Sequence, residues 1–218
     1  MNFIPAASEH ALTVDTITLV LLTLSTLLVA AVFISVIYFC IRYHVSSRAP
    51  RENPPARARA LELGLSALIF IFGLCTFIWS ARVFYEGFVP PASAREVYVT
   101  GKQWMWTFHD GRGPDQINHL VLAIGEPVKL IMTSEDVIHS FYIPALRIKQ
   151  DLLPGRYTSL WFQPSRLGRF EVLCSEYCGL DHSRMRATID VVDKKDLAEN
   201  KTVLKLPSEK VFFKYQCN

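Results

Sequence analysis

Two long uncharged segments constrain this chain more than any other feature of its sequence. Residues 16–41 form the first, with 26 residues that would make a helix of roughly 39 Å. Residues 63–81 form the second, with 19 residues that would make a helix of roughly 28 Å. The hydrocarbon core of a bilayer is about 30 Å thick, so both lengths match a membrane span. For the shorter segment, the alternative is a buried helix of a soluble protein, although few such helices are apolar all round.

Charges beside these segments predict their orientation. Residues 42–59, between the two spans, hold five arginines against one acid. The segment ahead of the first span has Glu9 and Asp15 but no lysine or arginine. Because short loops rich in positive charge stay in the cytoplasm, we expect a two-pass protein of the inner or cytoplasmic membrane. Both termini are then expected on the outer, periplasmic or equivalent, side.

From Glu86 onward the composition becomes that of a β domain. Pro90 and Pro91 end the helical pattern, and short runs of β-branched and aromatic residues follow. Gly and Pro turns separate seven candidate strands, which predict an antiparallel sandwich or a small Greek-key barrel. The candidate strands are residues 95–99, 103–109, 119–123, 128–133, 157–162, 169–174 and 186–192. A short helix is expected over residues 193–200, with a polar tail after it.

The predicted organisation therefore has six parts. They are an outer N-terminal segment (1–15), a first span (16–41), a cytoplasmic loop (42–61), a second span (62–85), the β domain (86–192), and a C-terminal helix and tail (193–218).

Composition excludes several classes of protein. A net charge of +3 is too balanced for nucleic-acid binding. The odd number of cysteines, five, argues against a disulfide scaffold. Cys40 and Cys75 lie in the spans, where packing residues are expected, and Cys217 has no functional interpretation. The sequence lacks the C-x-x-C-H motif that attaches a c-type haem.

The metal-binding side chains are concentrated between Cys174 and Met185. Two thiols, an imidazole and a thioether lie within these twelve residues, and His139 lies 35 residues before Cys174. Thiolate, thioether and imidazole together favour copper, because zinc seldom uses Met. A mononuclear blue-copper site needs only one Cys, whereas two thiolates can bridge two copper ions. The alternatives are a structural zinc site and a disulfide between Cys174 and Cys178.

The string Cys-Ser-Glu-Tyr-Cys-Gly-Leu-Asp-His-Ser-Arg-Met, residues 174–185, closely resembles subunit II of haem-copper cytochrome c oxidases. An upstream His in a His-Ser-Phe context, residues 139–141, strengthens the resemblance, as do residues 103–108 and 149–156. The resemblance covers residues 14–192, nearly the whole chain. It implies a membrane-anchored all-β protein, in which a two-helix transmembrane hairpin precedes a cupredoxin-like Greek-key barrel or sandwich.

The resemblance also implies a binuclear mixed-valence copper centre on this chain, without haem. Its ligands would be two bridging thiolates, two imidazoles, a weak axial thioether and a backbone carbonyl. In that order they are Cys174 and Cys178, His139 and His182, Met185, and Glu176. One ion would take His139 and Met185, and the other His182 and the carbonyl. The Glu176 side chain is expected to reach a magnesium ion at the boundary with the catalytic subunit.

Two further residues match positions of the family. Trp104 matches the surface Trp through which family members receive electrons from cytochrome c. The alternative, a buried strand aromatic, fits Trp106 or Trp161 better. Glu62 matches, in an ungapped comparison, a Glu at the mouth of a proton channel in the partner subunit. Its alternative is an acid at a helix N-terminus, stabilised by the helix dipole.

The predicted function is that of the electron-transfer subunit of a terminal cytochrome c oxidase, an oxidoreductase complex. The chain would accept single electrons from a cytochrome c-type donor and pass them to the haem of catalytic subunit I. There, oxygen would be reduced to water and protons pumped. Other oxidase subunits and the membrane are further expected partners. The alternatives are the copper subunit of a related complex, such as a nitric oxide reductase, and a copper-binding or assembly protein without turnover.

The charge of the outer domain predicts how the donor docks. Residues 86–218 hold 17 Lys/Arg against 16 Asp/Glu. Family members that use a soluble basic cytochrome c present an acidic face around the Trp, which steers the encounter. We therefore expect weak steering here, apolar docking, and a donor tethered nearby as a membrane-bound cytochrome or within a supercomplex.

Overall fold

The computed structural model describes residues 4–50 and 56–198 and divides the chain into two compact units. One unit is residues 14–83, which include most of two long helices. The other unit is a β domain that begins at residue 84 and also includes the residues up to 13. The predicted tail beyond residue 198 and Cys217 lie outside the described residues.

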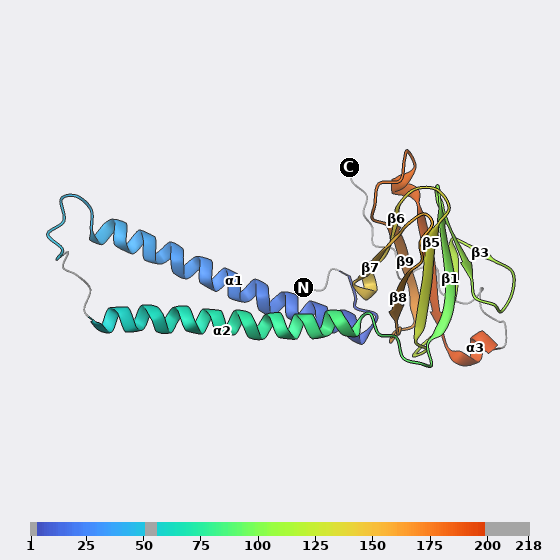
Figure 1. Cartoon of the computed structure of the whole chain (residues 1–218), viewed down its shortest axis with the longest axis horizontal. Coiled ribbons are helices and arrows are strands. Elements are labelled where there is room, and N and C mark those ends of the chain that lie inside the picture. The colour runs from blue at the N-terminus through green and yellow to red at the C-terminus, as the bar shows by residue number, and fades with distance from the viewer. Residues whose placement is uncertain (1–3, 51–55, 199–218) are drawn as a thin grey trace. The chain divides into compact units, whose positions relative to one another are not determined.

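The helices are α1 (Glu9–Arg42) and α2 (Ala56–Glu86), which Figure 1 shows as continuous ribbons. Each contains one predicted span and extends beyond it at the N-terminal end. Ser8 explains where α1 begins, because its Oγ accepts a hydrogen bond from the Ala11 N–H at 3.1 Å and caps the helix. Glu9 in the first turn complements the helix dipole.

Both helices are apolar enough to cross a membrane. None of the most hydrophobic 18-residue stretch of either helix is buried within the chain. The interpretation of residues 63–81 as a buried helix of a soluble protein is therefore wrong. Hydroxyl groups in α1 donate to carbonyls four residues earlier, for example Ser25 to Leu21 at 2.7 Å. Such bonds satisfy polar groups that lipid cannot, which suits a membrane anchor.

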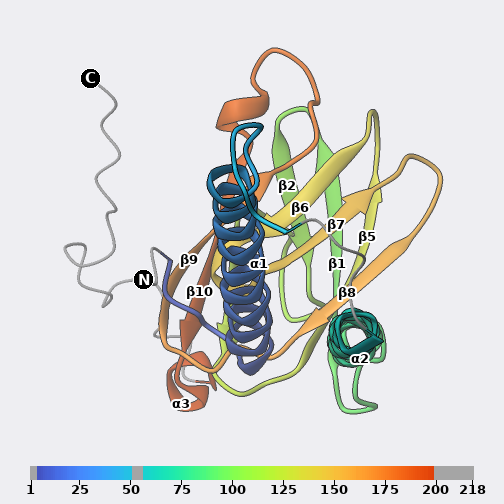
Figure 2. The same ribbon diagram turned by 90° about the vertical axis from the view of Figure 1, so that its left-hand side faces the viewer.

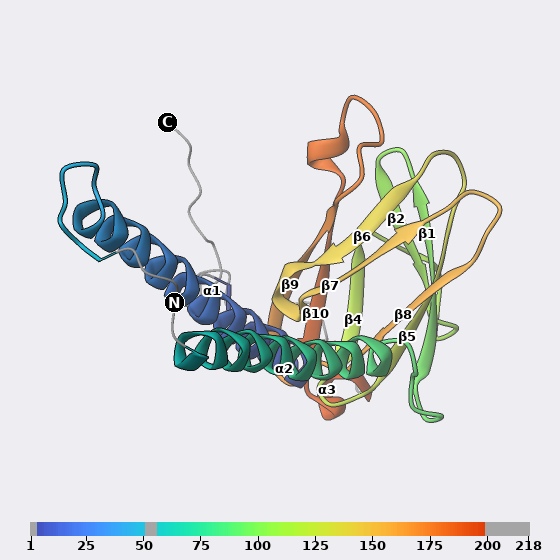
Figure 3. The same ribbon diagram turned by 60° about the vertical axis from the view of Figure 1, so that its left-hand side comes forward.

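The β domain is a sandwich of two five-stranded sheets. The strands are β1 (Arg95–Lys102), β2 (Met105–His109), β3 (Gln116–Ile117), β4 (His119–Ala123), β5 (Val128–Ser134), β6 (His139–Ile143), β7 (Ile148–Leu152), β8 (Thr158–Phe162), β9 (Gly168–Cys174) and β10 (Arg186–Val192). One sheet has the order β3-β2-β1-β5-β8 and the other β4-β10-β9-β6-β7. In Figure 3, β9 and β10 lie on one side of the domain and β1 and β5 on the other.

The predicted fold class is confirmed: a two-helix anchor precedes a cupredoxin-like all-β domain. The sheets are not purely antiparallel, since β1 pairs with β5 and β10 with β4 in parallel. Strands adjacent in space but distant in sequence give the domain its crossovers. The C-terminal helix is α3 (Lys194–Ala198), within the predicted range.

Alternating side chains of both sheets fill the core. Val128, Leu130 and Met132 of β5 point inward and are fully buried. Trp106 meets Phe141 edge-on at a centroid distance of 5.1 Å, which joins the two sheets. Trp106 is therefore the buried strand aromatic that the sequence predicts. This aromatic pair lies beside the elements that carry the metal-binding residues.

Strands β3, β6 and β7 have no counterpart among the seven predicted ones. Four of the five residues of β6 are buried, so the strand lacks the alternation that would reveal it. A 3₁₀ turn, η1 (Pro144–Leu146), reverses the chain between β6 and β7. After it, Arg147 adopts a left-handed conformation, with φ of 56°.

The residues just ahead of α1 belong to the β domain. The Ala7 N–H donates to the Ala145 carbonyl at 2.8 Å, and the Ser165 N–H donates to the Ala7 carbonyl at 2.9 Å. Ala7 is completely buried in the domain's hydrophobic core. The chain therefore returns, after both helices, to the domain that holds its own N-terminal segment.

Candidate metal centre

The candidate site is built on the loop between β9 and β10. Cys174 is the last residue of β9, and Met185 immediately precedes β10. A short 3₁₀ helix, η2 (His182–Arg184), turns the loop back toward the sheet. This loop lies at the opposite end of the sandwich from α3 (Figures 1 and 2).

Pairing between β6 and β9 supplies the remaining imidazole. Phe141 of β6 lies opposite Cys174 of β9, so His139 comes to the same end of the sheet as the loop. Gly101 of β1 leaves room for its ring, since a Cβ at Gly101 would lie 3.1 Å from the His139 Cδ2. Sheet pairing therefore unites residues that are 35 positions apart.

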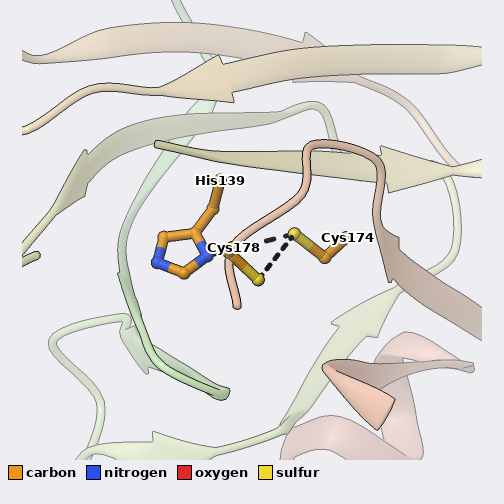
Figure 4. A group of neighbouring side chains, drawn as sticks. All are labelled: His139, Cys174 and Cys178. Carbon is orange, nitrogen blue, oxygen red and sulfur yellow. Dashed lines mark hydrogen bonds between the residues drawn. The ribbon is translucent and has the colours of Figure 1, made fainter. Parts of the chain in front are cut away.

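The side chains of His139, Cys174 and Cys178 converge, as Figure 4 shows. Their ligand atoms all lie within 4.8 Å of one another. The two sulfurs are 3.8 Å apart, and both cysteines are free thiols. The structure does not contain the alternative disulfide between Cys174 and Cys178.

Each sulfur has two further donor groups beside it. Cys174 Sγ lies 3.9 Å from His139 Nδ1 and 3.2 Å from the Glu176 carbonyl oxygen. Cys178 Sγ lies 3.5 Å from His182 Nδ1 and 3.7 Å from Met185 Sδ. All six predicted ligands are thus gathered at one place. Each thiol borders one donor predicted for the first ion and one predicted for the second.

Exposure differs sharply across the cluster. His139, Cys178 and Met185 are buried, with exposed fractions of 0%, 2% and 1%. Cys174 and His182 are half-buried, and Glu176 is exposed. The His139 side of the cluster is therefore dry, whereas the His182 side faces the surface.

The two thiols differ in acidity. Burial works to raise the pKa of Cys174, but hydrogen bonds from His139 and from nearby backbone outweigh it and lower the pKa to about 7. Burial, with the neighbouring Cys174 thiolate, raises the pKa of Cys178 to about 12. Two thiolates this close repel each other, so the second proton leaves when a cation compensates the charge. This pair therefore favours a metal ion.

The donor set identifies the kind of metal. Two thiolates, two imidazoles and a thioether are soft or borderline ligands, which suit copper. A structural zinc site uses four ligands and seldom includes Met. The residues present therefore fit copper better than zinc.

Trp104 lies in the turn between β1 and β2. It contacts the loop between β9 and β10, residues 174–185, which we call the copper loop. A Cβ placed on Gly179 would lie 3.3 Å from the Trp104 Cζ2 and 2.9 Å from the Gln103 Nε2. The Gln103 side chain also donates a hydrogen bond to the Cys178 carbonyl at 2.7 Å. The indole is partly buried and packs against the core. It therefore reaches the residue next to Cys178 without being a core residue itself.

Asp136 is a site residue that the sequence did not predict. Its Oδ1 accepts a hydrogen bond from His139 Nε2 at 2.8 Å, and its Oδ2 accepts one from the Gln103 N–H at 2.8 Å. Burial works to raise the pKa of Asp136, but donors from Gln103, His139 and Val137 outweigh it and lower the pKa to about 2. In the sequence, the feature that could have identified Asp136 is an acidic residue three positions before a candidate metal-binding histidine.

Glu62 belongs to the helical unit, whereas the metal cluster belongs to the β domain. It is exposed on α2, which begins six residues earlier at Ala56. Because the dipole effect falls off within the first turn, its interpretation as a helix N-terminal acid is wrong. Its expected place at a proton channel depends on a partner subunit and stays a prediction.

Comparisons with known proteins agree on one family. The family model described as "Cytochrome C oxidase subunit II, periplasmic domain" matches residues 110–192. The alternative cytochrome c oxidase subunit 2 of Bradyrhizobium diazoefficiens is 34% identical over 199 residues, which cover 76% of this chain and 71% of that protein. The cytochrome c oxidase subunit 2 of Cereibacter sphaeroides is 26% identical over 239 residues, which cover 90% and 78%.

Among solved structures, the periplasmic domain of cytochrome oxidase subunit II from Bradyrhizobium japonicum is similar to this chain. Its sequence identity is 30% and its TM-score 0.49, over 51% of this chain and 93% of that one.

Proposed function

This chain belongs to the cytochrome c oxidase subunit II family, and from that premise we propose that it is the electron-transfer subunit of a terminal oxidase. It accepts single electrons from a cytochrome c-type donor and delivers them to the haem of catalytic subunit I. Oxygen reduction and proton pumping take place on that other chain. The observation that carries the proposal is the arrangement of donors around Cys174 and Cys178.

A bridging ligand must border the ligands of both ions it joins. Cys174 has His139 on one side and the Glu176 carbonyl on the other, and Cys178 has Met185 and His182. In both cases one neighbour belongs to each of the two predicted ligand sets. This arrangement supports a binuclear centre over a mononuclear blue-copper site. Copper held by these residues would supply one-electron redox chemistry at the site.

The β scaffold suits rapid electron transfer. His139 is held in β6 and Cys174 in β9, and these strands are hydrogen-bonded to each other. Met185 and Cys178 are buried in the main hydrophobic core. Ligands fixed by close packing move little when charge changes. The protein scaffold therefore keeps the reorganisation energy of electron transfer low.

Trp104 is proposed as the residue through which electrons enter. Its ring contacts Gly179, the neighbour of Cys178, and Gln103 hydrogen-bonds to the Cys178 carbonyl. Short through-contact routes therefore lead from the indole to a bridging sulfur. Electrons are proposed to leave through His182, which is half-buried and whose ring centroid lies 5.8 Å from that of Tyr177.

The Glu176 side chain is available to bind a metal of another kind, in addition to copper. Its carbonyl belongs to the copper cluster, whereas its carboxylate is on an exposed residue. A hard carboxylate oxygen suits magnesium, which keeps most of its water ligands. We place the proposed magnesium ion at the boundary with the catalytic subunit.

The β domain and both termini are proposed to face the outer side of the membrane. The five arginines of residues 42–59, which include the connection and the adjoining helix ends, favour the cytoplasm for that connection. Ala7, ahead of α1, hydrogen-bonds to Ala145 and Ser165 of the β domain, which lies after α2. A chain that crosses the membrane twice must place the segment before α1 and the domain after α2 on the same side of the membrane. The family description of this domain as periplasmic supports the same orientation.

Copper content and spectrum of the full-length chain test the proposal. We expect two copper ions per chain and a purple mixed-valence spectrum, with the unpaired electron shared by both nuclei. Cys174→Ser should abolish that spectrum, and Cys75→Ser, a free thiol in α2, should leave it unchanged. Met185→Leu should keep both ions but shift the reduction potential, because an axial thioether tunes the site.

Two results would contradict the proposal. One is a single copper per chain with a blue-copper spectrum. The other is stoichiometric zinc in cells supplied with copper. A co-purified membrane protein, identified with its haem content, distinguishes an oxidase from a nitric oxide reductase. Stable copper without such a partner would instead indicate a copper carrier.

A further inference from the structure

One carboxylate joins the buried imidazole to the turn that carries Trp104. We propose that Asp136 is a positioning residue, which orients His139 toward copper and fixes the adjacent Gln103–Trp104 turn. Its two oxygens serve two different segments of the chain, β6 and the turn after β1. The inference rests on the proposed copper function, and its test distinguishes the two.

The first oxygen determines which ring nitrogen of His139 is available to a metal. A carboxylate accepts hydrogen bonds, so His139 Nε2 carries the hydrogen that bonds Asp136 Oδ1 at 2.8 Å. In a neutral imidazole the other nitrogen, Nδ1, then holds a free lone pair. That nitrogen is the one that faces Cys174, at 3.9 Å.

Asp136 is also the polar anchor of a ring that is otherwise held by packing. His139 is fully buried, and the Trp106 ring stands edge-on to it at 5.9 Å. These contacts restrict the ring but do not select between its two flipped orientations. A hydrogen bond to one nitrogen makes that selection, and such a partner also strengthens the ligand.

The second oxygen of Asp136 connects the metal site with the turn that carries Trp104. It accepts the Gln103 N–H at 2.8 Å, and the Gln103 side chain donates to the Cys178 carbonyl at 2.7 Å. A series of hydrogen bonds thus runs from Asp136, which holds the His139 ring, through Gln103 to Cys178 of the copper loop. Displacing this carboxylate would release His139 and the turn together.

Glu135 provides a matched control for charge. It lies next to Asp136 and carries the same charge, but it is exposed and pairs with Lys102 at 3.1 Å. Removing either acid changes the net charge by the same amount. If Asp136 acted only through its charge, for example in attracting a donor, the two substitutions would have similar effects.

The experiment compares Asp136→Asn with Glu135→Gln in the full-length chain. Copper affinity is measured by competition with a chelator, and the site is followed by electron paramagnetic resonance. Asp136 uses both oxygens as acceptors, Oδ1 for His139 and Val137 and Oδ2 for Gln103. An asparagine has only one acceptor oxygen, so either His139 or Gln103 loses its partner. We expect Asp136→Asn to lower copper affinity about 10–100-fold and to change the histidine hyperfine coupling. Glu135→Gln should stay within about twofold of the unmodified chain, as an exposed pair contributes little.

A second pair of variants covers the case in which Asp136→Asn does not fold. Asp136→Glu keeps the charge but displaces the carboxylate by one methylene, and Glu135→Asp is its control. Copper affinity and spectrum of Asp136→Glu equal to those of its control would overturn the inference. So would an Asp136→Asn protein that matches Glu135→Gln. An unmodified chain that binds no copper pair would instead refute the proposed function.

Discussion

Gly179 lies where the Trp104 turn meets the copper loop, and Gly179→Ala is expected to be costly for two reasons. The residue has φ of 115°, a conformation that side chains with a Cβ rarely adopt. Holding a non-glycine residue in such a conformation costs about 1–3 kcal/mol. The new Cβ would also lie 2.9 Å from the Gln103 Nε2, which must move away. Losing the Gln103 hydrogen bond to the Cys178 carbonyl costs about 0.5–1.5 kcal/mol more.

Gly111→Ala is the control for the first effect. Gly111 also has positive φ, 73°, but nothing lies within 4 Å of its Cβ position. We expect a free-energy loss of about 2–4 kcal/mol for Gly179→Ala and about 1–2 kcal/mol for Gly111→Ala.

The assay is thermal unfolding of the full-length chain in detergent, at one scan rate, followed by tryptophan fluorescence. A domain of about 100 residues loses roughly 4–8 °C in Tm for each 1 kcal/mol. Gly179→Ala should therefore unfold several degrees below Gly111→Ala and take up electrons from the donor more slowly. Equal Tm values for the two variants would refute the inferred contact between the turn and the loop.

Three further predictions concern electron uptake, donor docking and pH. Trp104→Phe should preserve copper content and spectrum but slow donor-driven turnover severely, whereas unchanged turnover would make Trp104 a packing residue. Donor-driven turnover should change less than about threefold when ionic strength rises from roughly 10 mM to 150 mM, although the Debye length falls from about 30 Å to about 8 Å. A steep decrease would instead reveal an acidic docking face. Burial works to raise the pKa of Asp190, but hydrogen bonds from Arg169 and His119 outweigh it and lower the pKa. Its contribution to stability is therefore present above the ordinary Asp pKa of about 3.9 and lost as pH falls through the lower folded value. Asp190→Asn should cost about 1–3 kcal/mol at pH 7 and flatten the acid side of the stability curve, as measured by urea unfolding.

Most of the candidate site could be predicted because its residues are close in sequence. Cys174, Cys178, His182 and Met185 belong to one loop, and their chemistry alone favours copper. His139 was harder to place, since its approach depends on the pairing of β6 with β9. The burial of β6 on both faces removes the alternation that would predict the strand. The resemblance to a family supplied what periodicity could not.

Asp136 and Gln103 were missed for a different reason. Gln103 is linked to the site through its own backbone N–H and through the Cys178 carbonyl, groups that any residue type could provide. The Asp136 bond to the His139 ring depends on the conformation of the short segment between these two residues. Sequence patterns report side-chain chemistry, and so they give little indication of such contacts. The length of α2 was also underestimated, because arginines and a glutamate extend the helix beyond the apolar span. Apolar length predicts the membrane span but not the helix end.

The charges around Trp104 show why net charge is an indirect guide to docking. Two of the acids near this turn are paired with cations: Glu135 with Lys102 at 3.1 Å, and Asp181 with Arg184 at 3.6 Å. An ion pair has a weak field beyond about one Debye length, roughly 8 Å at physiological ionic strength. These acids therefore attract a distant basic donor less than unpaired acids would. Because Lys102 and Glu135 come from separate segments of the chain, only the folded structure shows that this acid is paired. The expectation of weak steering therefore rests on how the charges are placed as well as on how many there are.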